Sequence, residues 1–121
     1  MKEKDFQSTF NKWVKAKFDK TAAFELKLCR TNALAFNSVA PHQIAALLAV
    51  RNGKLVYKIA DCGYQNPFDS FCMNKCEAYV VIKYPDFFCL IDINNWAQEE
   101  KMSSRKSLTS ERAKEIASIV I

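Results

Sequence analysis

Glu25 and Lys27 place a carboxylate and an ammonium group two residues apart in the apolar run Phe24-Glu25-Leu26-Lys27-Leu28. In a β-strand, alternate side chains share a face, so these groups would lie roughly 6 to 7 Å apart along the chain. A carboxylate coordinates hard cations such as Mg²⁺, and a nearby lysine can orient or help deprotonate a water that attacks a phosphate. The pair therefore indicates metal-dependent phosphodiester hydrolysis, although the triplet alone is also typical of a solvated strand face.

A second acid is expected near Glu25, because one carboxylate seldom holds Mg²⁺ alone. Asp69 is the preferred candidate, since the segment 67–69 begins a separate predicted strand and a neighbouring strand can place a side chain about 5 Å from Glu25. Asp19 lies roughly 20 Å upstream along an extended chain and reaches the ion only if the chain folds back sharply. Glu3, on the predicted first helix, is a third possibility at the end of the sheet. Each acid is also typical of an ordinary turn or surface position.

Hydrophobic periodicity predicts the elements that must position these residues. Apolar side chains at helical spacing predict an amphipathic helix over 5–18. Residues 21–29 alternate and predict a strand, with Phe24, Leu26 and Leu28 on its buried face and Glu25, Lys27 and Cys29 on the other. Both charged side chains therefore point the same way.

The rest of the chain alternates between helix and strand patterns. Pro41 suits the first turn of a helix over 42–50, which Asn52-Gly53 ends. Strands are predicted over 55–59, 68–73, 79–84 and 87–93, with a loop over 61–67, a helical turn over 94–98 and a polar basic stretch over 99–107. A closing helix over 109–119 begins at a Thr or Ser cap. This order predicts an α/β (α+β) fold, a mixed central sheet flanked by helices, in one domain spanning residues 1–121.

The charge balance favours a polyanionic partner. Eighteen Lys and Arg against thirteen Asp and Glu give a net charge of +5. Basic side chains of this kind bind the phosphate backbone and make binding sensitive to salt. The residues expected to contact DNA are Lys15, Lys17, Lys20, Arg30, Arg51 and Arg105.

The cysteines argue against a structural zinc site. The chain has five cysteines without a paired CxxC spacing, and one histidine. Only Cys72 and Cys76 support a redox interpretation, which is the weakest alternative. The charged beginning of the sequence and the lack of a long apolar run predict neither a secretory signal nor a membrane span, and hence a cytoplasmic protein with reduced thiols.

Five segments together resemble a known nuclease family: Phe24 to Leu28, Pro41-His42-Gln43 at a helix start, Ala78 to Ile82, Phe88 to Asp92, and Arg105 to Leu108. In this combination the sequence resembles the RecU-like Holliday junction resolvases of bacteria and phages, within the PD-(D/E)XK nuclease superfamily. The resemblance runs from about residue 24 to residue 108. It implies a restriction-endonuclease-like nuclease core, and together with the small size it favours a phage or prophage over a bacterial origin, with both left open.

The resemblance also assigns roles to particular residues. Glu25 resembles the metal-binding acid and Lys27 the catalytic lysine, with Mg²⁺ as the cofactor and Mn²⁺ as a substitute. Leu26 would lend its backbone carbonyl to the metal. Gln43 resembles a glutamine near the metal or phosphate, with a helix-surface residue as the equal alternative.

Three further residues would contact DNA by the same resemblance. His42 is expected at the helix start or against DNA rather than as a base. Arg105 and Lys106 resemble a basic pair that holds phosphates, with a solvated linker as an equal alternative.

The sequence departs from the family pattern in the position of the first aspartate, which normally precedes the Glu-x-Lys strand. Our hypothesis is that this acid has migrated to Asp69.

The predicted reaction is paired hydrolysis of phosphodiester bonds in branched DNA during recombination and repair, leaving 5′-phosphate ends as the family does. A four-way junction is nearly two-fold symmetric, so a homodimer with two active sites is expected. The alternatives are a nuclease of the same fold acting on other DNA structures, and a nuclease-fold protein that binds DNA without cutting it.

Overall fold

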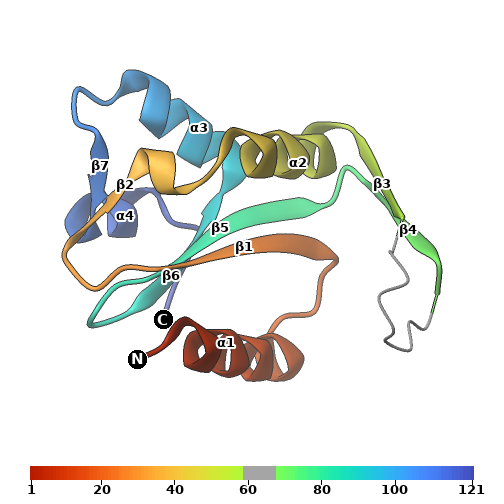
Figure 1. The fold of residues 1–121 in the computed structure, drawn as a ribbon, viewed down its shortest axis with the longest axis horizontal. Coiled ribbons are helices and arrows are strands. Elements are labelled where there is room, and N and C mark those ends of the chain that lie inside the picture. The colour runs from red at the N-terminus through yellow and green to blue at the C-terminus, as the bar shows by residue number, and fades with distance from the viewer. Residues whose placement is uncertain (59–67) are drawn as a thin grey trace.

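A four-stranded mixed sheet forms the centre of the fold, with helices on both faces (Figure 1). The computed structural model describes residues 1–58 and 68–121. The strands lie in the order β1-β5-β6-β8, where β1 and β5 are parallel and the other neighbours antiparallel. This confirms the predicted mixed sheet flanked by helices. The bounds are β1 (Ala22–Leu28), β5 (Glu77–Lys83), β6 (Phe88–Asp92) and β8 (Ile119–Val120).

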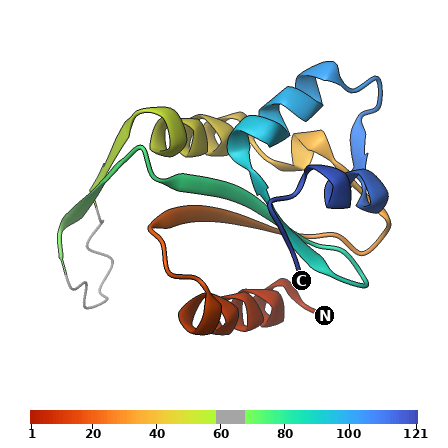
Figure 2. The ribbon, with the colours of Figure 1, turned by 180° about the vertical axis from the view of Figure 1, so that it is seen from behind.

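One face of the sheet is covered by α1 (Glu3–Lys17), the amphipathic helix that the sequence predicts. Phe6 and Phe10 are buried against the sheet residues Tyr79, Val81 and Leu90. Burying each phenylalanine side chain contributes about 2 kcal/mol. Figure 2 shows α1 alone on its side of the sheet, opposite α2 and α3.

The other face carries α2 (Pro41–Asn52) and α3 (Ile93–Met102). Val80 and Ile91 of the sheet pack there with Leu47 and Val50 of α2 and with Trp96 of α3. The predicted helix over 42–50 is confirmed, with Pro41 in its first turn. The predicted helical turn over 94–98 is instead part of a longer helix, which Asp92 caps by accepting a hydrogen bond from the Asn94 N–H (2.9 Å).

A small antiparallel ladder joins two distant parts of the chain, β2 (Ala33–Ala35) and β7 (Ser107–Thr109). A short 3-10 helix, η1 (Phe36–Ser38), follows β2, and α4 (Ser110–Ile116) follows β7. Thr109 caps α4 by accepting a hydrogen bond from the Arg112 N–H, as the Thr or Ser cap predicts. The helix ends before the predicted residue 119, because the chain then enters β8 and pairs with β6. The sequence did not predict β2, β7 or β8.

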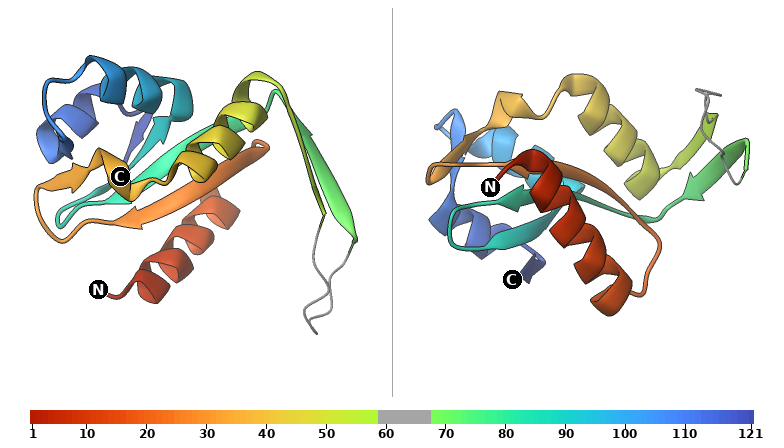
Figure 3. Two further views of the ribbon diagram at one scale, coloured as in Figure 1. Left: turned by 45° about the horizontal axis from the view of Figure 1, so that its top comes forward. Right: turned by 60° about the horizontal axis from the view of Figure 1, so that its bottom comes forward.

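Two strands leave the body of the protein as a projecting hairpin, β3 (Lys54–Lys58) and β4 (Ser70–Asn74) (Figure 3). We call residues 54–58 and 68–74 the β-arm. Backbone hydrogen bonds fix its base, because Lys75 N–H donates to the Gly53 carbonyl (2.8 Å) and Cys76 N–H to the Val50 carbonyl (2.9 Å). The two predicted strands are confirmed in their described part, whereas the predicted loop over 61–67 lies outside the described residues.

Within the described ranges, none of the helices has the length and apolar character that crossing a bilayer requires.

Candidate active site at the open edge of the sheet

Glu25 and Lys27 share one face of β1, as the alternating pattern predicts, and the structure places that face on the α2 side. Phe24 and Leu26 pack with the apolar cluster under α1, whereas Ala23 packs with the cluster under α2. The Lys27 Nζ lies 3.4 Å from the Glu25 Oε1, and the two side chains keep 21% and 28% of their surface exposed. The pair is thus partly shielded from solvent, which strengthens its electrostatic interactions while leaving access for a ligand.

Gln43, in the first turn of α2, fixes the position of the Glu25 carboxylate. The Gln43 Oε1 accepts a hydrogen bond from the Ala40 N–H (3.0 Å), which caps the start of α2. The Gln43 Nε2 donates to the Glu25 Oε1 (2.9 Å). Because the amide oxygen is used by the helix cap, the amide nitrogen is the group left to face the carboxylate. Gln43 is therefore half-buried and joined to Glu25.

The backbone of β1 turns the Leu26 carbonyl toward open space. Cys29 N–H donates to the Lys83 carbonyl (2.8 Å), and the Thr21 carbonyl accepts from Glu77 N–H (3.3 Å). In a strand, the backbone groups of successive residues point to opposite sides. Thr21 and Cys29 direct their backbone groups to β5, and so does every second residue between them. Leu26 is not one of these residues, so its carbonyl points to the other edge of β1. Among the described residues no strand pairs with β1 at that edge.

A hollow lies at this open edge between α1 and β1. Glu3 lines it together with Glu25 and Leu26, so Glu3 lies beside the middle of β1 and not at the end of the sheet as predicted. Gln7 and Asn11 also line it, one and two helical turns after Glu3. The sequence analysis missed Asn11, although its spacing of four residues from Gln7 on an amphipathic helix could have identified it.

The predicted position of Asp69 beside Glu25 is wrong. Asp69 precedes β4, which pairs with β3 and not with β1. The register joins Lys54 to Asn74 at the base of the β-arm and Lys58 to Ser70 at its outer end, so Asp69 is exposed at the outer end. The error arose because strand type can be read from local pattern, but strand partners cannot.

Asp19 is exposed in the connection between α1 and β1. In the part of the chain that the structure describes, no group of three His, Cys, Asp or Glu side chains is placed to hold a metal ion together. The acid that shares a hollow with Glu25 is therefore Glu3, and the other oxygen donors there are the Leu26 carbonyl, Gln7 and Asn11.

Two of the predicted DNA-contacting side chains have acidic partners inside the protein. The Arg51 Nε donates to the Asp92 Oδ2 (2.9 Å), and this hydrogen bond and charge raise the pKa of Arg51. The Lys20 Nζ lies 3.5 Å from the Glu77 Oε2. Arg51 thus ties α2 to the start of α3, which is a structural role.

The other side chains predicted to contact DNA have no acidic partner among the described residues. Over residues 1–58 and 68–121, no carboxylate lies within 4.0 Å of their side-chain nitrogens. His42 is exposed beside Gln43 at the start of α2, and Arg30 donates to the Met1 carbonyl (3.4 Å). The exposed basic residues in this group are Lys15, Lys17, Arg30, Arg105 and Lys106.

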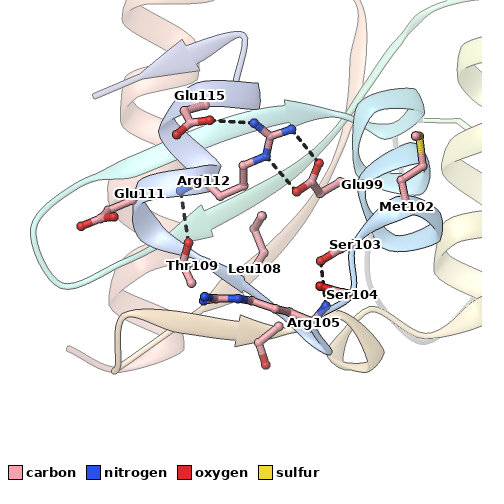
Figure 4. A pocket seen from close by; sticks show the side chains of 11 residues that line it. Glu99, Met102, Ser103, Ser104, Arg105, Leu108, Thr109, Glu111, Arg112 and Glu115 are labelled. Carbon is pink, nitrogen blue, oxygen red and sulfur yellow. Dashed lines mark hydrogen bonds and ion pairs between the residues drawn. The ribbon is translucent and has the colours of Figure 1, made fainter.

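A second polar pocket lies between α3, β7 and α4 (Figure 4). Arg112 crosses it, donating to both oxygens of Glu99 (2.9 and 3.0 Å) and to Glu115 (2.6 Å). These hydrogen bonds raise the pKa of Arg112. Arg105 lines the same pocket. Since Arg112 already has carboxylate partners on two helices, this pocket is a clamp between α3 and α4 rather than a site for chemistry.

The Glu25 site therefore brings together a carboxylate with one oxygen that receives no hydrogen bond from the described residues, an ammonium group, an amide that holds the carboxylate, and a backbone carbonyl at an open edge. Oxygen donors in such a set suit a hard divalent cation. A scan against protein-family models, a search of the curated proteins and a search of the solved structures each found no match for this chain.

Proposed function

We propose that the protein is a Mg²⁺-dependent endodeoxyribonuclease of nuclease-like fold that resolves branched DNA as a homodimer. The observation that carries the proposal is the double contact on the Glu25 Oε1, which receives the Gln43 amide at 2.9 Å and the Lys27 ammonium at 3.4 Å. A half-buried carboxylate on an edge strand, oriented through contacts on one oxygen, is suited to binding a cation. The resemblance to RecU-like resolvases supplies the substrate class.

The residues at the open edge fit a magnesium ion. Within residues 1–58 and 68–121, no group donates a hydrogen bond to the Glu25 Oε2, so this oxygen is available as a ligand. The Leu26 carbonyl and Glu3 are the further oxygen donors that would hold the ion. When bound, Mg²⁺ supplies an attacking water of lowered pKa and stabilises the charge on the phosphate oxygens.

The side chains of the site have separate tasks in this proposal. Gln43 holds the Glu25 carboxylate in one orientation, because the α2 cap fixes the glutamine in turn. Lys27 lies on the same face and orients the water or balances the negative charge of the phosphate. Exposed Lys15, Lys17, Arg105 and Lys106 bind phosphates of the DNA backbone, so affinity should fall steeply with salt.

Cleavage of a four-way junction, beside a linear duplex of the same sequence, tests this function. We expect nicking of the junction in Mg²⁺ and at least about a hundredfold lower rate for Lys27→Ala, while junction binding is kept. Lys101→Ala, which removes an exposed lysine from the last turn of α3, is the matched control and should cleave normally.

Three results would count against the proposal. Equal cleavage of duplex and junction would indicate a nuclease for other DNA structures. Binding without any Mg²⁺-dependent or Mn²⁺-dependent cleavage would indicate a DNA-binding protein that does not cut. Light scattering that gives a monomer at micromolar concentration, with and without junction DNA, would exclude the paired mechanism.

A further inference from the structure

A further pocket lies where β1 ends beside the turn between β5 and β6. Met1, residues 28–30 and residues 83–85 line it, and we call it the edge pocket. Its two charged side chains are Arg30, which is exposed, and Lys83, which is half-buried. None of the described residues that line the edge pocket is acidic. The edge pocket therefore favours a negatively charged ligand.

The edge pocket continues the hollow of the Glu25 site along the open edge of β1. Leu26 lines the hollow, and Leu28 lines the edge pocket. By strand alternation both side chains lie on the α1 face of β1, about 7 Å apart along the strand. At the start of α1, Glu3 lines the hollow and Met1 lines the edge pocket. An extended ligand that occupies the hollow therefore reaches the edge pocket next.

The turn between β5 and β6 holds the Lys83 ammonium group in place. The Lys83 Nζ donates to the Tyr84 carbonyl (2.6 Å) and to the Pro85 carbonyl (3.1 Å). An ammonium group has three N–H donors, so one remains for a ligand. Within residues 1–58 and 68–121, no carboxylate lies within 4.0 Å of this group. Because a half-buried cation is costly without a counterion, an anion that binds here stabilises the lysine.

Arg30 supplies the second positive charge from the end of β1. One of its N–H groups donates to the Met1 carbonyl (3.4 Å). A guanidinium group has five N–H donors in a planar fork that matches a phosphate, so most of its donors remain for a ligand. The two cations come from neighbouring strands, because Leu28 of β1 pairs with Lys83 of β5. Both can therefore contact one anion in the edge pocket.

The charges next to the edge pocket distinguish between possible anions. The hollow carries the carboxylates of Glu3 and Glu25, whereas the edge pocket carries Arg30 and Lys83. An acidic peptide that reached the edge pocket would be repelled by these carboxylates. A DNA strand would meet them through the Mg²⁺ of the proposed function, and its next phosphates would then need cations from the protein. The order of charges along the edge therefore favours nucleic acid.

We propose that the edge pocket binds an internal phosphate of the DNA strand that passes through the Glu25 site, with Arg30 and Lys83 on its oxygens. This inference deepens the proposed function and rests on it for the identity of the strand. Leu26 and Arg30 are about 13 Å apart along an extended chain, so the bound phosphate lies within a few nucleotides of the cleaved bond. Arg30 and Lys83 are positioning residues, because they fix the strand and do not touch the reacting atoms.

Neutral phosphates in the DNA test the proposal without any cleavage. Four-way junctions that each carry one uncharged methylphosphonate, at successive positions around the branch, are bound to the full-length chain in EDTA. We expect Arg30→Gln/Lys83→Gln to bind the unmodified junction about tenfold more weakly, and the slope of log affinity against log salt to fall by about one. At one position near the branch, the methylphosphonate should weaken binding by the original protein but not by this double variant. Positions contacted by other basic residues should keep their effect.

Three further variants separate the contact from general changes in charge or folding. Lys101→Gln removes an exposed lysine from the last turn of α3 and should keep the affinity and the whole methylphosphonate pattern. Arg30→Lys/Lys83→Arg keeps both charges and should retain the effect at the critical position. Thermal unfolding checks each variant. If the double variant does not fold, Arg30→Gln alone, at an exposed side chain, should bind about threefold more weakly and reduce the effect at the same position.

The proposal is overturned if the folded double variant keeps the effect of the methylphosphonate at every position. It is also overturned if the edge pocket responds to strand ends, so that only a 5′-phosphate in place of a 5′-hydroxyl changes binding through Arg30 and Lys83. Poly-glutamate that displaced DNA from the original protein but not from the double variant would assign the edge pocket to an acidic chain instead.

Failure of the proposed cleavage is a separate result. Lys27→Ala must keep the full methylphosphonate pattern whether or not the protein cuts DNA. Normal junction cleavage, together with a pattern that does not depend on Arg30 or Lys83, would overturn this inference alone.

Discussion

Two charged clusters in this protein differ in how completely their charges are paired. In the α3–α4 clamp, Arg112 donates to both oxygens of Glu99 and to Glu115, at distances of 2.6 to 3.0 Å. In the Glu25 site, both contacts fall on one oxygen, and the ammonium group is at 3.4 Å. The first arrangement engages all three guanidinium nitrogens, and in the second no described residue donates a hydrogen bond to the other carboxylate oxygen.

The difference is the one expected between a structural cluster and the functional site that we propose. A bidentate arginine–carboxylate pair has strict geometry and leaves little capacity for a ligand. The Glu25 carboxylate is oriented by Gln43 through one oxygen, and the Leu26 carbonyl beside it faces the open edge. A cluster that is held in place but not fully paired is what a metal-dependent site requires before its ion binds.

The largest effect should come from removing one carboxylate from each cluster. Glu25→Gln keeps the size of the side chain but removes the charge that would bind Mg²⁺ in the proposed mechanism, so we expect junction cleavage to fall by about 10³-fold or more. Its thermal midpoint should stay close to that of the original protein, because a partly exposed ion pair contributes little stability. Cleavage is measured under single-turnover conditions, and the midpoint by calorimetry.

Glu99→Gln is the matched substitution in the clamp, and the opposite pattern is expected. Loss of the bidentate partner of Arg112 should lower the thermal midpoint by a few degrees and leave cleavage unchanged. If Glu99→Gln abolished cleavage while Glu25→Gln did not, the roles assigned to the two clusters would be reversed.

An intermediate effect is expected for Gln43, which is a positioning residue. Gln43→Ala removes the hydrogen bond to Glu25 and the cap of α2, so cleavage should fall about 10-fold to 100-fold. The pH profile and the Mg²⁺ dependence of the rate distinguish positioning from simple destabilisation. A variant that needs more Mg²⁺ but reaches a near-normal maximal rate supports positioning. A variant whose loss follows only its fraction unfolded contradicts it.

The smallest effect concerns the buried core and not either cluster. Burial raises the pKa of the Cys89 thiol from its ordinary value of 9.0 to about 12. Between these values the folded protein keeps the proton that the unfolded chain loses. The contribution of the thiol to stability is therefore full below pH 9 and falls as the pH rises toward 12, by at most about 1.4 kcal/mol per pH unit.

Urea unfolding from about pH 8 to pH 11 measures this slope. Cys89→Ala should be less stable at pH 8 but show a flatter decline, and the decline that remains includes Tyr79 and Tyr84, whose pKa values burial also raises. An unchanged slope in Cys89→Ala would mean that the thiol does not carry the effect. This loss of stability at alkaline pH must be measured before the pH dependence of the two charged clusters is compared.

Local pattern predicted the elements that position the site, because burial of one face imposes a period. Alternation in β1 placed Glu25 and Lys27 together on the correct face, and Pro41 marked the start of the helix that carries Gln43. The helix and strand types of α1, β5 and β6 followed in the same way.

Features set by distant contacts could not be predicted. The strands β2, β7 and β8 have two or three residues each, too few to show a period, and their pairing depends on the rest of the fold. Asp69 was placed beside Glu25 because nothing in the local sequence says that β4 pairs with β3. The hydrogen bond from Gln43 to Glu25 likewise depends on how α2 crosses the sheet.

The parallel pairing of β1 with β5 also has a consequence for synthesis on the ribosome. Ala22 pairs with Glu77 and Leu28 with Lys83, and α2 and the β-arm intervene between the two strands. A nascent chain that has not reached residue 77 offers β1 no parallel neighbour, and closing so long a loop is slow. The strand that bears Glu25 and Lys27 therefore joins the sheet late, which would postpone assembly of the proposed metal site until translation has passed β5.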